Sequence, residues 1–485
     1  MAKRAKSPAT VIVDVLSPTC DLFCDRIGTP WAGVPVNGHV EYWRIFSMGF
    51  RAWVKRRYFE IRKCAVGTPA VEDALGVLAG LAADKPVRDV HLRLAHHEGK
   101  IYFDLGGPDW QFVEISAAGW GFVNNPPIPF RRTRGMKELP KPVEVADREI
   151  CDLRDHTTLD DTGWMLVMGW LLGAFGPGDY PILVLNGEQG SGKSTLTEIL
   201  RRMIDPSEAM TRAAPRDEQG LMIGADNNFI LAFDNLSTLP DWLSDGFCRL
   251  STGAGWSARR LYSDSDEVII SARRPIIING ITDLVTRPDL LDRALLVTVP
   301  PIVERKTKAD FWHEFEQAQP VLLGKLLDVL VHALKNFELT KLDSYPRMAD
   351  FAQWVEAGAP KLGWESGKFL RTYGELIQTA NLQVLDFSIL GSELQELIHK
   401  RGAWSGTTFD LLSALQLQSL GTPQMDYFSR LKPHILSGEL KRLVPVLRQV
   451  GIGVEFVKPQ RINGKVQKLI EISSLNIGAQ KVRVP

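Results

Sequence analysis

The sequence predicts an α/β protein built around a glycine-rich loop, with a small α/β module before it and a helical module with a β-hairpin after it. First, an apolar run at 181–186 leads into a glycine-rich loop and then a helix. Second, apolar β-rich runs recur at 228–235, 275–279 and 295–299 with helical stretches among them. Third, the basic C-terminal region pairs helices with a hairpin signal. Strands alternating with helices indicate a parallel sheet covered by helices.

Composition limits the classes of protein that fit. The chain of 485 residues suggests about three domains. Lys+Arg and Asp+Glu both number 57, so any nucleic-acid surface must be local. The five cysteines contain no CxxC and form no zinc spacing with the nine histidines, which favours reduced thiols and a cytoplasmic protein. The apolar stretch at 11–16 is too short for a secretory signal, and no stretch is long enough to span a membrane.

We expect residues 1–123 to form an α/β accessory domain with helices at 46–63 and 71–82. Short strands are predicted at 90–95, 100–105, 112–115 and 121–123. One face of the first helix carries Phe46, Phe50, Trp53, Val54, Tyr58 and Ile61. The other faces carry Arg51, Lys55, Arg56, Arg57, Arg62 and Lys63. This basic helix can contact DNA, but we favour a solvated face over an aromatic core.

Residues 124–145 read as a linker rich in proline and arginine. Arg131, Arg132 and Arg134 could contact phosphate, although basic linkers often have no such role. No primase or nuclease carboxylate cluster has a readable spacing before residue 146, so priming would need a separate protein.

The glycine-rich loop carries the most specific motif. Gly187, Gly192, Lys193 and Ser194 fit G-x-x-x-x-G-K-[ST]. In this pattern backbone N–H groups surround phosphate oxygens, the lysine reaches the β- and γ-phosphates, and the hydroxyl ligates Mg²⁺. The sequence therefore predicts ATP and Mg²⁺ as ligands. The expected nucleotide contacts are Gly187, Gln189, Gly190, Ser191, Gly192, Lys193, Ser194 and Thr195.

A Walker B pattern follows about 40 residues later, where an apolar strand ends in Asp234-Asn235. A carboxylate at this strand end holds Mg²⁺ in nucleotide hydrolases, so Ser194 and Asp234 are the predicted metal residues. Beyond it we expect a helix at 242–253, a hairpin with polar residues 263–266 at its tip, and a buried strand ending at Asn279. The ATPase domain is expected to cover 146–305.

This order resembles the superfamily 3 helicases, a branch of the AAA+ ATPases found in viruses, phages and mobile elements. It is most similar to phage- and island-encoded replication ATPases, whose Walker B reads Asp-Asn-Leu-Ser as in Asp234-Asn235-Leu236-Ser237. The other matching motifs are Trp242-Leu-Ser-Asp, Thr252-Gly-Ala-Gly, Arg260-Leu-Tyr and Arg274-Pro-Ile-Ile-Ile-Asn279-Gly. The resemblance is specific across about 160–300 and looser to about 475.

The resemblance implies roles for individual residues. Asn279 matches sensor 1, which positions the attacking water. Arg293 matches the arginine finger that completes a neighbouring subunit's site, with Arg287 as the alternative. Arg259 and Arg260 fall where the family has a hairpin that grips DNA, although a salt bridge to Asp264, Asp266 or Glu267 is the bland alternative.

Asn235 departs from the pattern of many AAA+ motors, which place a glutamate after the Walker B aspartate. An amide can orient water but cannot take its proton. Either another carboxylate helps, or hydrolysis is slow.

Residues 306–400 are expected to form a helical, lid-like region, starting with a helix at 308–337. It contains Pro346-Arg347-Met-Ala-Asp350-Phe351, a motif that family members share. Arg347 is predicted either to contact the nucleotide as a lid arginine or to pair with Asp350 three residues on.

Residues 401–485 predict a winged-helix-like domain. Helices at 407–415, 427–435 and 438–450 precede strands at 454–458 and 465–472, which flank the turn Asn463-Gly464. From residue 430 onward the chain has eleven Lys or Arg residues but only three acidic residues, and this excess of positive charge suits phosphate contacts. Lys441, Arg442, Arg448 and Lys465 are the predicted DNA contacts, with protein docking as the alternative.

Together these features predict an ATP-dependent DNA helicase that works as a ring, expected to be a hexamer, in replication of a phage or mobile element. One alternative is an ATP-switched platform that binds DNA or loads another helicase, which Asn235 favours. Another is a mobile-element defence ATPase that uses the same motor.

Overall fold

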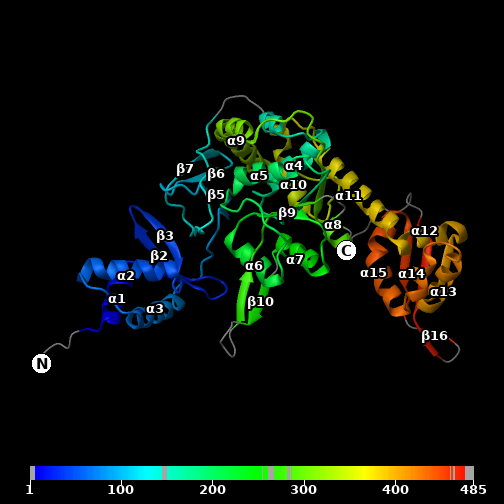
Figure 1. Cartoon of the computed structure of the whole chain (residues 1–485), viewed down its shortest axis with the longest axis horizontal. Helices are drawn as coiled ribbons and strands as arrows, with labels where there is room; N and C mark the ends of the chain where they lie inside the picture. Colours follow the sequence, from blue (N-terminus) through cyan, green and yellow to red (C-terminus); the bar gives the residue numbers. More distant parts are fainter. Residues whose placement is uncertain are drawn as a thin grey trace. The chain divides into compact units, whose positions relative to one another are not determined.

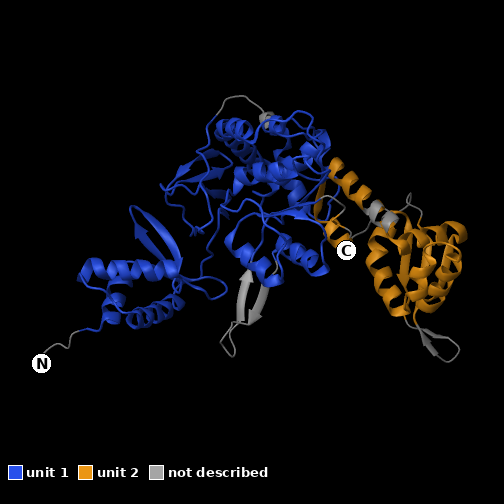
Figure 2. Cartoon of the chain, in the orientation of Figure 1, with its two compact units in different colours: residues 1–282, 297–370 blue, residues 283–296, 371–485 orange. Residues whose placement is uncertain are grey.

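We describe the protein from a computed structural model, which covers residues 6–144, 150–253, 255–259, 267–280, 284–285, 287–458, 460–462 and 465–475. The chain divides into two compact units (Figure 2). Unit 1 comprises residues 1–282 and 297–370, and unit 2 comprises residues 283–296 and 371–485. Among the described residues, no helix combines the length and the apolar character needed to cross a bilayer.

Unit 1 begins with an N-terminal module of helices and a small sheet (Figure 1). Its elements are α1 (Pro8–Leu16), β1 (Asp21–Cys24), β2 (Pro30–Val36), β3 (His39–Arg44), α2 (Met48–Arg62) and α3 (Thr68–Ala83). The three strands form an antiparallel sheet, which the sequence did not predict. Both predicted helices are present. The module buries Phe50, Val71, Leu75 and Leu78 in its core.

An antiparallel four-stranded sheet follows, in chain order β4 (Leu94–His97), β5 (Lys100–Asp104), β6 (Phe112–Ser116) and β7 (Gly119–Val123). The strand predicted at 90–95 starts only at Leu94. The preceding residue, Arg93, has φ 63°, a left-handed conformation that no strand adopts. Its side chain is fully buried and bonds to the carbonyl oxygen of Asp104.

The segment expected to be a linker is bonded to the rest of unit 1 along its described length. Arg131 forms an ion pair with Asp226, and the Arg132 guanidinium lies 2.6 Å from the Asp104 carboxylate. Farther along, the backbone N–H of Val143 donates to the carbonyl oxygen of Pro320. These contacts join residues distant in sequence, so composition alone did not reveal them.

A buried ion network joins Arg93 to the end of the helix that follows the glycine-rich loop. Arg93 Nε lies 3.1 Å from Asp205 Oδ1, and Arg201 Nη2 lies 3.4 Å from Asp205 Oδ2. Asp205 also accepts the backbone N–H groups of Phe229 and Ile230. Burial acts to raise the pKa of Asp205, but the two guanidinium charges and these hydrogen bonds outweigh it and hold the pKa below its usual range.

We expect Asp205→Asn to lower the free energy of unfolding by about 3–5 kcal/mol at pH 7, because two buried arginines lose their counter-charge. The folded-state pKa of Asp205 is depressed, so its stabilisation is present at neutral pH and is lost as the pH falls below about 4. Urea unfolding measured across this pH range should show a flatter acid limb for the variant. Asp343→Asn, at an exposed site, is the control; equal stability of the two variants would contradict the prediction.

The central sheet of the chain has four strands in the order β13-β8-β12-β9, of which β13 begins in the segment assigned to unit 2. Its strands are β8 (Ile182–Asn186), β9 (Leu231–Leu236), β12 (Ile276–Gly280) and β13 (Ala294–Thr298). β12 runs parallel to both β8 and β9. The intervening elements of unit 1 are α5 (Lys193–Ile204), α6 (Glu218–Asn227), α7 (Asp241–Thr252), and the hairpin β10 (Gly255–Arg259) and β11 (Glu267–Ser271). The short helix α8 (Pro288–Leu291) belongs to unit 2. This mixed α/β architecture with a parallel sheet agrees with the α/β part of the predicted fold class.

Helices cover this sheet (Figure 1). Before the sheet lie η1 (Ile150–His156) and α4 (Asp161–Gly173), and after it α9 (Lys308–Asn336), η2 (Phe337–Leu339), α10 (Ala349–Gly358) and η3 (Ala359–Leu362). α4 is buried from Gly163 to Gly173. A β-carbon at Gly169 would lie 2.4 Å from the ring of Phe369, so this close packing requires glycine.

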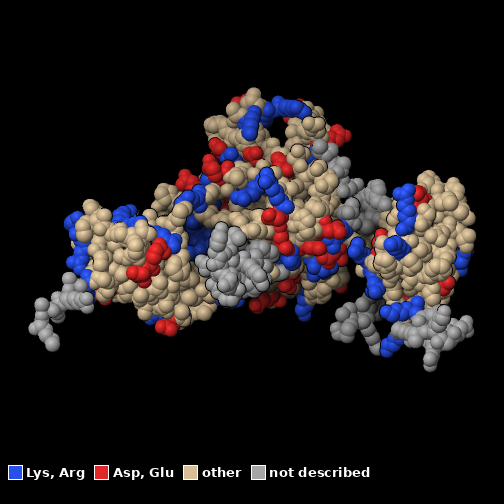
Figure 3. Space-filling view, turned by 60° about the horizontal axis from the view of Figure 1, so that its bottom comes forward, with Lys and Arg blue, Asp and Glu red and all other residues tan. Residues whose placement is uncertain are grey.

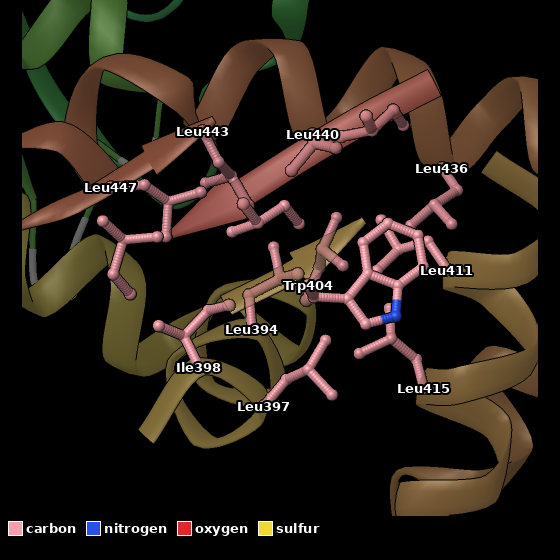
Figure 4. Close-up of a cluster of buried hydrophobic side chains, with 14 of the residues drawn as sticks. Leu394, Leu397, Ile398, Trp404, Leu411, Leu415, Leu436, Leu440, Leu443 and Leu447 are labelled. Carbon is pink, nitrogen blue, oxygen red and sulfur yellow. The ribbon is translucent and has the colours of Figure 1, made fainter. Parts of the chain in front are cut away.

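Unit 2 contains its own apolar core. The boundary between the units falls within α11 (Lys368–Phe387). The other elements are α12 (Ile389–Arg401), β14 (Ala403–Thr407), α13 (Thr408–Gln418), α14 (Met425–Arg430), α15 (Pro433–Gln449), β15 (Ile452–Phe456), β16 (Gln460–Ile462), β17 (Lys465–Gln467) and β18 (Leu469–Ser474). Leucines of α12, α13 and α15 surround Trp404 (Figure 4). β18 pairs with both β15 and β14, and the sequence did not predict β14.

Candidate functional site

The glycine-rich loop lies at the carboxyl edge of the central sheet. β8 leads directly into residues 187–192, and α5 begins at Lys193. A β-carbon at Gly187 would lie 2.6 Å from the carbonyl oxygen of Val299, so only glycine allows this backbone approach. The strand–loop–helix context predicted for the motif is therefore present.

The start of α5 offers backbone donors. Its N-cap, Gly192, has φ 89° and provides no side-chain acceptor for the first N–H groups of the helix. Such free N–H groups, together with the positive end of the helix dipole, favour an anion. The Ser191 hydroxyl is buried and has no hydrogen-bond partner among the described residues. These features fit a phosphate group.

Lys193 folds back over the loop. Its Nζ donates to the carbonyl oxygens of Gly187 and Glu188, both at 2.7 Å. The side chain is half-buried. The loop therefore holds one positive charge beside the backbone donors, as binding of a polyphosphate requires.

Ser194 and Asp234 meet across the edge of the sheet. Ser194 Oγ donates to Asp234 Oδ1 at 3.1 Å. A hydroxyl and a carboxylate are hard oxygen ligands that suit Mg²⁺, which usually binds through one or two protein groups plus phosphate and water. Among the described residues no cluster of three or more His, Cys, Asp or Glu is able to hold a metal by itself.

Asn279 links the ends of β12 and β9 to α5. Its Oδ1 accepts the backbone N–H of Asn235 at 2.8 Å, and its Nδ2 donates to Thr197 Oγ1 at 3.3 Å. The Thr197 hydroxyl in turn donates to the carbonyl oxygen of Lys193 at 3.0 Å. Asn235 itself has φ 57°, a left-handed conformation that asparagine tolerates better than most residues. Both ends of the buried Asn279 amide are thus occupied by protein groups.

The structure brings together the predicted loop residues, Asp234, Asn235 and Asn279. Each of the predicted arginines has its own surroundings. Arg287 and Arg293 belong to unit 2, where Arg293 Nη1 lies 2.6 Å from Asp289 Oδ1. Arg347 is exposed in the turn before α10.

The predicted DNA contacts are described only in part. Arg260 lies outside the described residues, as do the side chains of Arg259 and Lys465. The backbone register places Arg259 opposite Glu267 in the β10–β11 hairpin. On α15, Lys441, Arg442 and Arg448 are exposed.

Sequence analysis missed two residues beside the loop. Thr197 lies one helical turn after Lys193, and this spacing was a readable signal. Arg305 had no readable signal in the sequence, because it lies in an irregular segment without a motif. A β-carbon at Gly190 would lie 3.3 Å from Arg305 Nη2, so this guanidinium is beside the loop.

By its fold and this site, the protein belongs to the α/β proteins that carry a glycine-rich loop of the phosphate-binding type at the edge of a parallel sheet. Within it, residues 153–360 match the family described as actinomycete integrative conjugative element replication protein. Residues 390–481 match the C-terminal domain of that replication protein. The chain is therefore similar, in both of these regions, to a replication protein of a mobile element. No curated protein matches it.

Three solved structures are similar over much of the chain. The SCCmec type IV Cch active helicase shares 11% identity at a TM-score of 0.49, covering 94% of this chain and 93% of that one. The NrS-1 C-terminal region shares 15% identity at a TM-score of 0.37, covering 96% of this chain and 99% of that one. The MCM homologue from Methanopyrus kandleri shares 13% identity at a TM-score of 0.27, covering 68% of this chain and 88% of that one. Similarity at this level does not transfer an activity to this chain.

Proposed function

We propose that this protein is a replication ATPase of a mobile element, with a superfamily 3-like AAA+ core, that hydrolyses Mg²⁺-ATP to move along DNA and separate its strands. One observation carries the proposal: two sets of hydrogen bonds lie at one edge of the sheet. Ser194 bonds to Asp234, and Asn279 bonds to the Asn235 backbone and to Thr197, which in turn bonds to the carbonyl oxygen of Lys193. The match to a mobile-element replication protein supports the biological setting.

Each residue of the cluster has a chemical task. The backbone N–H groups at the start of α5 and the Lys193 ammonium bind the phosphates and neutralise charge that builds up during phosphoryl transfer. Ser194 and Asp234 hold Mg²⁺, which supplies further neutralisation of the phosphate oxygens. The Asn279 amide keeps the Asn235 backbone in place beside Asp234, so the water-orienting groups have a fixed geometry.

Coupling to DNA requires further surfaces. We assign the β10–β11 hairpin, which carries Arg259, and the exposed cations of α15 to phosphate contacts, which need no sequence recognition. The three-stranded sheet and helices of unit 2 support a winged-helix-like role for this domain. Arg293 acts on a neighbouring subunit, so the working form is a ring, expected to be a hexamer.

A second function is favoured by Asn235. This residue occupies the position where many motors have a glutamate, and an amide cannot accept the proton of the attacking water. Slow hydrolysis would suit a platform that binds ATP, closes on DNA and loads another helicase, without separating strands itself.

Strand displacement on a forked DNA with ATP and Mg²⁺ distinguishes the two functions. A motor releases the labelled strand and shows ATP turnover that DNA stimulates. A platform binds ATP and the fork, yet releases no strand under the same conditions. Omission of Mg²⁺ is the matched control, because it leaves the protein and the DNA unchanged while removing the ion that Ser194 and Asp234 are proposed to hold.

A further inference from the structure

The outward face of α2 presents an aromatic side chain to solvent. α2 packs through Phe50 and Val54, which are buried, whereas Phe59 is 53% exposed. Phe59 lies about one-third of a turn or more from every buried position of the helix, since successive residues are 100° apart. Burial in the module core therefore does not account for this phenylalanine.

Four cations surround Phe59 on the helix. Residues three and four positions away are the neighbours of a helical side chain. For Phe59 all four are basic: Lys55 and Arg56 precede it on α2, and Arg62 follows it. The fourth, Lys63, is the C-cap residue with φ 54°, and its backbone N–H donates to the carbonyl oxygen of Phe59. All four are exposed. Figure 3 shows Lys and Arg side chains gathered at the end of the N-terminal module. We call these five residues the Phe59 surface.

The charges of this surface are only weakly neutralised. Arg56 Nε lies 3.6 Å from Glu60 Oε1, and Glu60 is closer to Arg57, at 3.0 Å. Exposed ion pairs of this kind contribute little and yield to a better partner. Arg62 and Lys63 have no ion pair with any described residue. By contrast, Arg51 on the same helix is held by Glu72 at 2.7 Å.

We propose that the Phe59 surface binds single-stranded nucleic acid. The four cations contact phosphates along the strand, and an unpaired base stacks on the Phe59 ring. A stacking platform flanked by cations suits single strands, because only an unpaired base exposes its face. A duplex would use the cations but not the ring. A membrane would need a broad, continuous apolar face. The other exposed apolar side chains of α2 do not extend Phe59 into one, because Ile61 points about 160° away from it and Met48 lies about three turns from it.

The two parts of the surface have separable signatures in a binding titration. The full chain is titrated without nucleotide into a labelled oligothymidylate at several salt concentrations. The logarithm of the association constant falls linearly with the logarithm of the salt concentration, and each phosphate contact on a single strand adds about 0.7 to the steepness of this fall. Glutamine at Lys55, Arg56, Arg62 and Lys63 should therefore make the fall less steep by about 3. Phe59→Ala should weaken binding roughly 5- to 150-fold without changing the slope, and Phe59→Trp should restore affinity.

Matched controls isolate this surface from the rest of the chain. Glutamine at the exposed Lys335, Lys341, Lys361 and Lys368 removes the same charge elsewhere. A slope equal to that of this control would overturn the proposal, as would an unchanged affinity of Phe59→Ala. If Phe59→Ala weakened binding to a blunt duplex as much as binding to the single strand, the stacking role would be overturned. The proposal would also be overturned if the protein bound phosphatidylserine vesicles and the variants lost this binding while they kept their affinity for DNA. The proposal stands whether or not the motor separates strands, because no step here uses ATP.

Discussion

Arg293→Ala is expected to lower kcat for ATP hydrolysis by about 10³–10⁵-fold while ATP binding persists. A guanidinium spreads its charge over several phosphoryl oxygens when charge moves in the transition state, so its loss affects turnover more than affinity. The Arg293 side chain is 13% exposed and pairs with Asp289, so thermal unfolding of the variant is measured beside its turnover to separate a loss of stability from a loss of catalysis. Steady-state turnover and ATP titration of the same preparation measure the two effects.

Complementation tests whether Arg293 acts on a neighbour. Arg293→Ala retains its own nucleotide loop, and Lys193→Ala retains its arginine. In randomly mixed rings roughly a quarter of the interfaces would join an intact loop to an intact arginine. Two inactive preparations should therefore regain turnover when they are mixed. No recovery would contradict a shared site, and recovery with Arg287→Ala in place of Arg293→Ala would transfer the role to Arg287.

Lys193→Ala is expected to reduce ATP turnover by at least about 10²–10³-fold and to abolish strand displacement. The ammonium is a fixed positive charge beside the backbone donors of the loop, and such preorganised charges contribute several kcal/mol to transition-state binding. Nucleotide affinity should fall as well, because the same charge binds the ground-state phosphates.

Among the described residues the Lys193 side chain bonds to two loop carbonyl oxygens, so its removal should lower the free energy of unfolding by at most about 1–3 kcal/mol. Thermal unfolding without nucleotide checks this. Lys335→Ala, on the exposed side of α9, is the matched control for loss of a lysine. Full turnover in Lys193→Ala would contradict the site assigned here.

The glycine-rich loop and the ends of β9 and β12 were readable in the sequence because each depends on neighbouring residues. An apolar run predicts a buried strand, and glycine at fixed spacing predicts the turn into α5. The same reason explains why the β10–β11 hairpin was predicted at the correct place, since its strands are joined by a short connection.

Pairings between distant segments were not readable. The β1–β3 sheet and β14 depend on partners that local periodicity does not specify. The buried pair Arg93–Asp205 and the bonds of residues 124–144 also escaped prediction, since composition reads arginine as a surface residue.

The sequence by itself determined which residues form the glycine-rich loop, which carboxylate ends the neighbouring strand, and where the cations lie along the chain. Tertiary structure decided how these groups are used. It turned the Asn279 amide toward Asn235 and Thr197, and it left Phe59 outside the core among its four cations. The reason is physical: side-chain type is encoded locally, whereas burial and orientation depend on which distant surfaces pack together.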